Sequence, residues 1–126
     1  MKRIIIALSI LLLTFLATWS HSFYVSAFTE ELTALLETAE IRAEHEDWEA
    51  AQELTQAAKD KWEARELYLH ILLRHNETDS VYIGFREVIE FIQCQEGGEY
   101  SAANARLIAE LELLAEAEQL TMKNIL

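Results

Sequence analysis

Two carboxylates and an imidazole have the spacing most suggestive of metal chemistry. Glu63, Glu66 and His70 stand at positions i, i+3 and i+7, so a helix would carry them on one side, where they could approach a metal ion together. Helical bundles that hold metals take ligands from several helices, commonly through Glu-x-x-His pairs. The chain has no second motif of this kind. We therefore interpret the three residues as a solvated helix face, and keep a metal site there as an alternative.

Cys94 is the only cysteine in the sequence, and its neighbours do not prepare it for nucleophilic chemistry. A cysteine nucleophile needs a base and a lowered thiol pKa, whereas the flanking residues are Gln93, Gln95 and Glu96. One cysteine also excludes an internal disulfide and a cysteine-built zinc site. The sequence holds no Gly-rich phosphate loop, no Gly-x-Ser-x-Gly motif and no His-Glu-x-x-His motif. We predict no enzymatic activity, no cofactor and no bound metal.

The composition predicts one small helical domain. The chain has 126 residues, no proline and three glycines, too few turn-forming residues for a sandwich or barrel of short strands. Its 22 acidic and 10 basic residues give a net charge of −12 at pH 7. Binding to nucleic acid requires clustered Lys and Arg that neutralise phosphates, so we expect no nucleic-acid partner.

The first 28 residues contain an apolar run that is long enough to cross a membrane. Ile4 to Phe28 holds no Asp, Glu, Lys or Arg, and would form about 37 Å of helix at 1.5 Å per residue. A bilayer core of about 30 Å needs about 20 apolar residues. In the second half of the run, Trp19, Phe23 and Tyr24 suit the membrane–water interface. We predict an uncleaved membrane anchor over residues 1–28.

A cleaved signal peptide is the main alternative. The two basic residues at positions 2 and 3 would be its charged start, Ile4 to Ala17 its apolar core, and Val25-Ser26-Ala27 its small-residue cleavage site. Ten residues separate that core from Ala27, which is long for the segment before a cleavage site. If cleavage occurred there, the mature protein would be secreted and would begin at Phe28.

Charge sets the expected orientation of the chain. Lys2 and Arg3 precede the span, whereas two glutamates follow it at positions 30 and 31, so the positive-inside rule places the N-terminus in the cytoplasm. The domain over residues 29–126 then lies outside, with 8 basic and 22 acidic residues and a net charge of −14. Anionic headgroups repel this charge within about 8 Å, so the domain should stand off the surface. We predict a single-pass protein of the cell membrane with an extracytoplasmic domain.

Apolar residues recur at helical spacing from Thr29 to the C-terminus. We predict an all-α fold, in which the anchor is followed by an antiparallel bundle of three to four helices with short connections. The segments cover roughly 29–43, 47–75, 78–97 and 101–121. Asp47 and Ser101 are expected to cap the N-termini of the second and fourth segments. A polar break at Asn76–Ser80 should precede the third segment, with Thr78 or Asp79 as its cap, and the pair Gly97-Gly98 should end that segment with positive φ. Antiparallel packing would return residues 122–126 towards the bilayer.

Four aromatic residues are candidate anchors, either of the core or of a partner. Trp48 and Trp62 are 14 residues apart, which is two heptads, so they share a helix face. Phe85 and Phe91 lie in the third predicted segment. A tryptophan stripe at helical spacing is typical of a core, and a partner-binding groove is the alternative interpretation.

Several of these features follow one another in a recognisable order. They are the Lys-Arg start before Ile4 to Ala17, the helix opening Asp47-Trp48-x-x-Ala51, Trp62, and the end Glu118-x-Leu120-x-x-x-Asn124-Ile125-Leu126. Together they cover nearly the whole chain and resemble the family of small bacterial proteins catalogued as domain of unknown function 4363. The stretch from Cys94 to Gly98 matches no part of that pattern. The resemblance implies a membrane-anchored, all-helical protein, mostly of Gram-positive spore-forming lineages, and it implies no activity.

The sequence as a whole predicts a structural or interaction protein. We expect it to bind another envelope or sporulation component through a helix face, by filling a groove or completing a bundle. The alternatives are a secreted helical protein cleaved near Ala27, and a metal-binding or enzymatic domain that uses Glu66 and His70. No oligomeric state is predicted.

Overall fold

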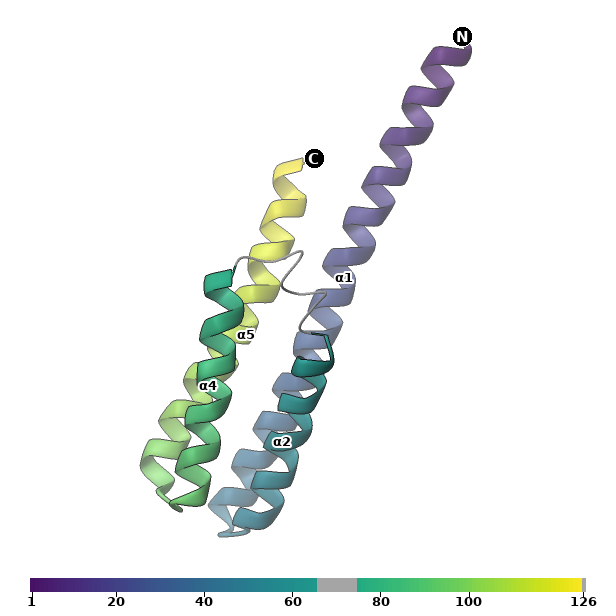
Figure 1. The fold of residues 1–126 in the computed structure, drawn as a ribbon. Coiled ribbons are helices and arrows are strands. Elements are labelled where there is room, and N and C mark those ends of the chain that lie inside the picture. The colour runs from purple at the N-terminus through teal and green to yellow at the C-terminus, as the bar shows by residue number, and fades with distance from the viewer. Residues whose placement is uncertain (66–74, 126) are drawn as a thin grey trace.

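The computed structural model describes residues 1–65 and 75–125, with side chains described for 1–65 and 78–120. The described residues form four helices and no strand (Figure 1), with bounds α1 Lys2–Glu44, α2 Trp48–Ala64, α4 His75–Gln93 and α5 Gly97–Ile125. The predicted fold class, an N-terminal apolar helix followed by an all-α antiparallel bundle, is confirmed.

The apolar run and the first helix of the bundle are one continuous helix. α1 is 43 residues long and contains neither glycine nor proline, so nothing in its sequence breaks it. Its N-terminal part projects beyond the other helices (Figure 1), and none of its most apolar 18-residue stretch is buried. From Ser22 onward, one side of α1 is buried in the bundle. By length and composition, α1 can cross a membrane, and the same properties fit a signal sequence.

The four helices pack as a ring in which each contacts two neighbours. α1 packs against α2 and α5, and α4 packs against the same two helices from the opposite side (Figure 1). α5 runs back towards the end from which α1 projects. The core is a single cluster along the axis of the ring; its largest fully buried side chains are Trp62, Tyr100, Phe85, Leu32, Leu36, Ile92, Leu107 and Leu111.

The bundle consists of two equivalent helical hairpins. The buried positions of α1 and α2 recur 49 residues later in α4 and α5, as in the pairs Leu32 and Val81, Leu36 and Phe85, Ala39 and Val88, Ala43 and Ile92, Ala51 and Tyr100, Thr55 and Asn104, Ala58 and Leu107, and Trp62 and Leu111. In several of these pairs, a buried alanine of the first hairpin corresponds to a larger buried residue of the second, as in Ala51 and Tyr100 or Ala58 and Leu107. Small and large side chains are thereby combined in one core, which close packing requires.

The same turn closes both hairpins, and it corrects the predicted end of the third segment. After α1, the Asp47 N–H donates to the Arg42 carbonyl, and Glu46, the middle one of the three residues between the helices, has φ 62°. After α4, the Glu96 N–H donates to the Phe91 carbonyl in the same way, and Gln95 has φ 54°. These bonds span five residues, as in the Schellman motif. α4 therefore ends at Gln93, and no glycine has positive φ.

Three predicted helix starts have different outcomes. Asp47 is confirmed as the N-cap of α2, since its carboxylate accepts a bond of 3.2 Å from the Ala50 N–H. Ser101 is wrong as a cap, because the Tyr100 N–H already bonds to the Glu96 carbonyl at 2.8 Å and the helix begins at Gly97. The predicted break at Asn76–Ser80 is also wrong. Those residues belong to α4, in which Thr78 is buried one turn before the buried Val81, so the apolar face of the helix extends through the predicted break.

α2 ends before residue 75, the furthest end that the spacing of its apolar residues allowed. The helix ends at Ala64, and Arg65 is its C-cap. The predicted continuation to residue 75 falls largely on residues 66–74, which lie outside the described residues.

Candidate binding surfaces at the two ends of the bundle

Aromatic residues mark the point where α1 leaves the bundle. Trp19 is 54% exposed and Phe23 is 69% exposed, although both are large apolar side chains. Tyr24 lies one position further along and is 38% exposed. Amphipathic aromatic rings at this depth of a helix are typical of the membrane–water interface.

A stack of rings and a cation ties the end of α2 to α1 just below this point. The rings of Tyr24 and Phe28 are stacked at 6.3 Å, and Phe28 is stacked on Trp62 at the same distance. The Arg65 guanidinium lies 4.8 Å from the centre of the Phe28 ring and donates to the Tyr24 hydroxyl. A guanidinium over aromatic faces contributes cation–π attraction as well as packing.

An ion pair and a histidine–glutamate contact join the helices at the same end. Lys61 of α2 donates to Glu31 of α1, and this hydrogen bond, together with the lysine charge, lowers the pKa of the Glu31 carboxyl. His21 of α1 and Glu118 of α5 approach to 3.1 Å, and both side chains are partly buried. The part of α1 next to its projecting end is thus held by contacts from both of its neighbours.

The opposite end of the bundle carries an acidic groove. Residues of both hairpin turns line a cavity of about 900 Å³, which we call the turn groove; its lining is Glu40, Ala43, Glu44, Glu46, Asp47, Trp48, Glu49, Gln95, Gly97, Tyr100 and Ser101. Five of these described residues carry carboxylates, and none is basic. The charge is concentrated because the last turn of α1 and the first turn of α2 meet there.

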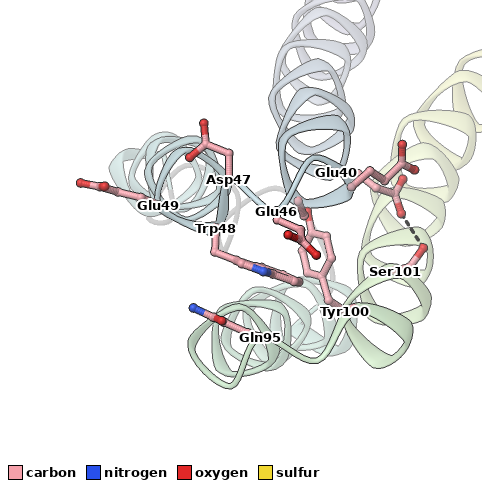
Figure 2. Close-up of a pocket in the computed structure, with 11 residues that line it drawn as sticks. Glu40, Glu46, Asp47, Trp48, Glu49, Gln95, Tyr100 and Ser101 are labelled. Atoms are coloured by element: carbon pink, nitrogen blue, oxygen red, sulfur yellow. Dashed lines mark hydrogen bonds between the residues drawn. The ribbon is translucent and has the colours of Figure 1, made fainter.

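The carboxylates of the turn groove have different orientations (Figure 2). In this view Glu46 points towards the Tyr100 ring, whereas Asp47 and Glu49 extend away from it. Glu40 accepts a bond of 2.8 Å from the Ser101 hydroxyl, which fixes its position across the α1–α5 contact. The groove is therefore negative on the α1 side.

Two aromatic residues form the floor of the turn groove. The Trp48 ring meets the Tyr100 ring edge-on, with centres 5.7 Å apart and planes at 77°. Tyr100 is 1% exposed, and its hydroxyl has no hydrogen-bond partner. Burial, with the charges of Glu40 and Glu44, raises the pKa of this hydroxyl well above its usual range. Tyr100 thus stays protonated and keeps both a donor and acceptor sites.

The four aromatic residues singled out in the sequence do not share one surface. Trp62 and Phe85 are buried in the core, and Phe91 is partly buried against it. Trp48 is half-buried and lines the turn groove. Sequence reasoning missed Tyr100, although a buried ring was detectable from its place four and seven residues before Asn104 and Leu107, on one helix face.

The residues considered for metal binding are not assembled into a site within the described part of the chain. There, no group of three His, Cys, Asp or Glu side chains is placed to hold a metal ion. Glu63 is exposed on α2, while Glu66 and His70 lie outside the described residues. Cys94 is exposed in the second turn.

Comparison with known families decides the affiliation of the chain. A family described as a domain of unknown function, DUF4363, matches residues 19–125. The chain belongs to this family. The matched region of this DUF4363 protein begins at Trp19, where α1 approaches the bundle, and spans the whole bundle. No curated protein and no solved structure matches the chain.

Proposed function

We propose that this DUF4363 protein is a membrane-anchored, extracytoplasmic helical protein that binds another component of the cell envelope and is not an enzyme. The observation that carries the proposal is the uncovered apolar part of α1. None of its most apolar 18 residues is buried, yet they continue without a break into the buried side of the bundle. In water this surface would be an aggregation site, and a bilayer is the environment that accommodates it.

The packing of α1 favours an anchor over a removable signal peptide. Cleavage after Ala27 would remove Val25, which is fully buried. It would also remove Tyr24, which accepts a bond from Arg65, and His21, which pairs with Glu118. A peptide that is removed contributes nothing to the mature fold, whereas this one supplies contacts to both neighbouring helices.

The charge distribution supports an extracytoplasmic bundle. Lys2 and Arg3 precede the span, and the turn groove at the far end of the bundle is acidic. The positive-inside rule then orients the N-terminus towards the cytoplasm. Aromatic rings are enriched at protein interfaces, and carboxylates complement a basic partner surface, so the proposal assigns the bundle a binding role.

Labelling of the native cysteine tests the placement. Cys94 is exposed in the membrane-distal turn and is the only cysteine in the sequence. A membrane-impermeant maleimide should label it in intact cells, in a protein that stays in the membrane fraction after a high-salt wash. The control is a Lys2→Cys, Cys94→Ala double variant, which should be labelled only after permeabilisation. Labelling of that variant in intact cells, or a mature chain that begins at Phe28, would refute the proposal.

A further inference from the structure

The turn groove combines negative charge with a buried polar group that lacks a partner. Glu40, Glu44 and Glu46 contribute carboxylates, and the Tyr100 ring points between Trp48 and the α1 side of the groove (Figure 2). A buried hydroxyl without a hydrogen bond costs free energy. The turn groove thus has an unused hydrogen-bonding group, itself covered in the free protein, beside an excess of negative charge.

The shape of the aromatic floor narrows the chemistry of a ligand. The Trp48 ring is half-buried and meets Tyr100 edge-on, so part of the indole remains available to a ligand. Cations are attracted to the face of an indole, and guanidinium stacks there more readily than ammonium does. Guanidinium also donates to several acceptors at once, which suits neighbouring carboxylates and a hydroxyl oxygen.

We propose that the turn groove binds an arginine-containing basic segment of a partner protein, with one guanidinium seated against Trp48 and donating to the carboxylates of α1 and to the Tyr100 hydroxyl. This inference rests on the proposed binding role and names the chemistry of the partner. A cavity of about 900 Å³ is larger than one guanidinium, so the segment enters with several residues.

Two other occupants fit the groove less well. A metal ion needs several ligands within one coordination sphere, and no group of three His, Cys, Asp or Glu in the described residues has that arrangement. Anionic lipid headgroups are repelled by the carboxylates. The groove also lies at the turn end, opposite the end from which the apolar part of α1 projects (Figure 1).

Peptide binding to the purified full-length protein tests the inference. The probe is a short fluorescein-labelled peptide of alternating arginine and glycine, with a citrulline–glycine peptide as the neutral isostere. Fluorescence anisotropy is measured in zwitterionic micelles at fixed salt. We expect saturable binding of the arginine peptide, and at least about tenfold weaker binding of the citrulline peptide because its side chain carries no charge. Equal binding of the two peptides would overturn the inference.

Variants locate the binding. A Glu40→Gln, Glu44→Gln double variant keeps an oxygen that accepts from Ser101 and should bind the arginine peptide at least about tenfold more weakly, because two charges are lost. Tyr100→Phe keeps the ring and should weaken binding about three- to tenfold. Glu116→Gln, an exposed change on α5 outside the groove, should leave binding within about twofold. Wild-type affinity in both groove variants would place the peptide elsewhere and refute the assignment.

Stability separates a binding role of Tyr100 from a structural one. Because its hydroxyl has no partner in the free protein, Tyr100→Phe should leave the melting temperature unchanged or raise it. A lower melting temperature would show that the hydroxyl serves the fold, and would overturn its role in binding. The maleimide experiment is independent: peptide binding with failed surface labelling would remove only the placement, and labelling without peptide binding would remove only this inference.

Discussion

Replacing Gln95 with glycine should stabilise the bundle. Gln95 has φ 54°, in the left-handed region, and it closes the turn between α4 and α5. L-residues occupy that region at a cost of about 1–2 kcal/mol because Cβ approaches the following carbonyl oxygen, and glycine has no Cβ. The two glycines of this turn region stand at 97 and 98, inside the first turn of α5, where neither has positive φ.

The expected gain is smaller than the relieved strain. Glycine also enlarges the conformational freedom of the unfolded chain, which offsets about 0.4–1 kcal/mol. For Gln95→Gly we therefore expect the free energy of unfolding to rise by about 0.5–1 kcal/mol. In a domain of this size, 1 kcal/mol corresponds to about 4–8 °C in melting temperature. Glu46→Gly, at the equivalent position of the first turn with φ 62°, should act in the same direction.

Thermal unfolding of the full-length protein in micelles, followed by circular dichroism, measures the effect. The matched control is Gly98→Ala, because a Cβ at that position would meet nothing within 4 Å and alanine favours the helix by up to about 1 kcal/mol. Both changes should raise the melting temperature, and their effects should be close to additive in the double variant. A fall in melting temperature for both Gln95→Gly and Glu46→Gly would show that the left-handed conformation carries no strain here, and would refute the reasoning.

Three further changes test the packing. Phe85→Ala should lower the free energy of unfolding, measured by urea titration, by about 3–5 kcal/mol because the ring is fully buried. Phe91 is only partly buried, so Phe91→Ala should lower it clearly less. Equal losses would contradict the assigned core. Asp47→Ala should cost about 1 kcal/mol and Asp47→Asn much less, since the amide oxygen still caps α2; an equal cost would exclude the cap. Gly84→Val should destabilise by about 1–3 kcal/mol, because even a Cβ would approach Leu107 to 2.9 Å, and an unchanged melting temperature would show that α4 and α5 can separate freely.

The spacing of apolar residues predicted the helices because those residues form the side of each helix that is buried in the core. The stripe that includes Leu32 and Leu36 is buried as its spacing indicates, and α2 begins at Asp47 as its capping residue indicates. The end of α4 was not predictable from glycine, since the turn uses Gln95 in the left-handed region. A rule based on residue type fails where tertiary packing of a hairpin imposes the conformation.

The turn groove could not be derived from the sequence in the same way. It forms where two turns about 49 residues apart along the chain lie side by side, and no local pattern encodes that contact. Trp48 was identified as an anchor without its setting, and Tyr100 was missed because a tyrosine at helical spacing signals burial, not an unpartnered hydroxyl. The correspondence of the two hairpins was equally hidden, because it lies in burial and turn geometry, not in residue identity.

The continuity of α1 determines how the groove is presented. Between Ser22, where the bundle begins, and Glu44, where α1 ends, the helix rises roughly 33 Å at 1.5 Å per residue. If α1 spans the membrane as proposed, the tilt of the span is also the tilt of the bundle, because no break separates the apolar part from this section. A tilt of about 20°, ordinary for membrane helices, would displace the groove sideways by roughly 11 Å. A flexible linker would let the groove occupy many positions, whereas a continuous helix holds it at one distance from the span. Binding of a partner segment at that distance therefore costs less conformational entropy.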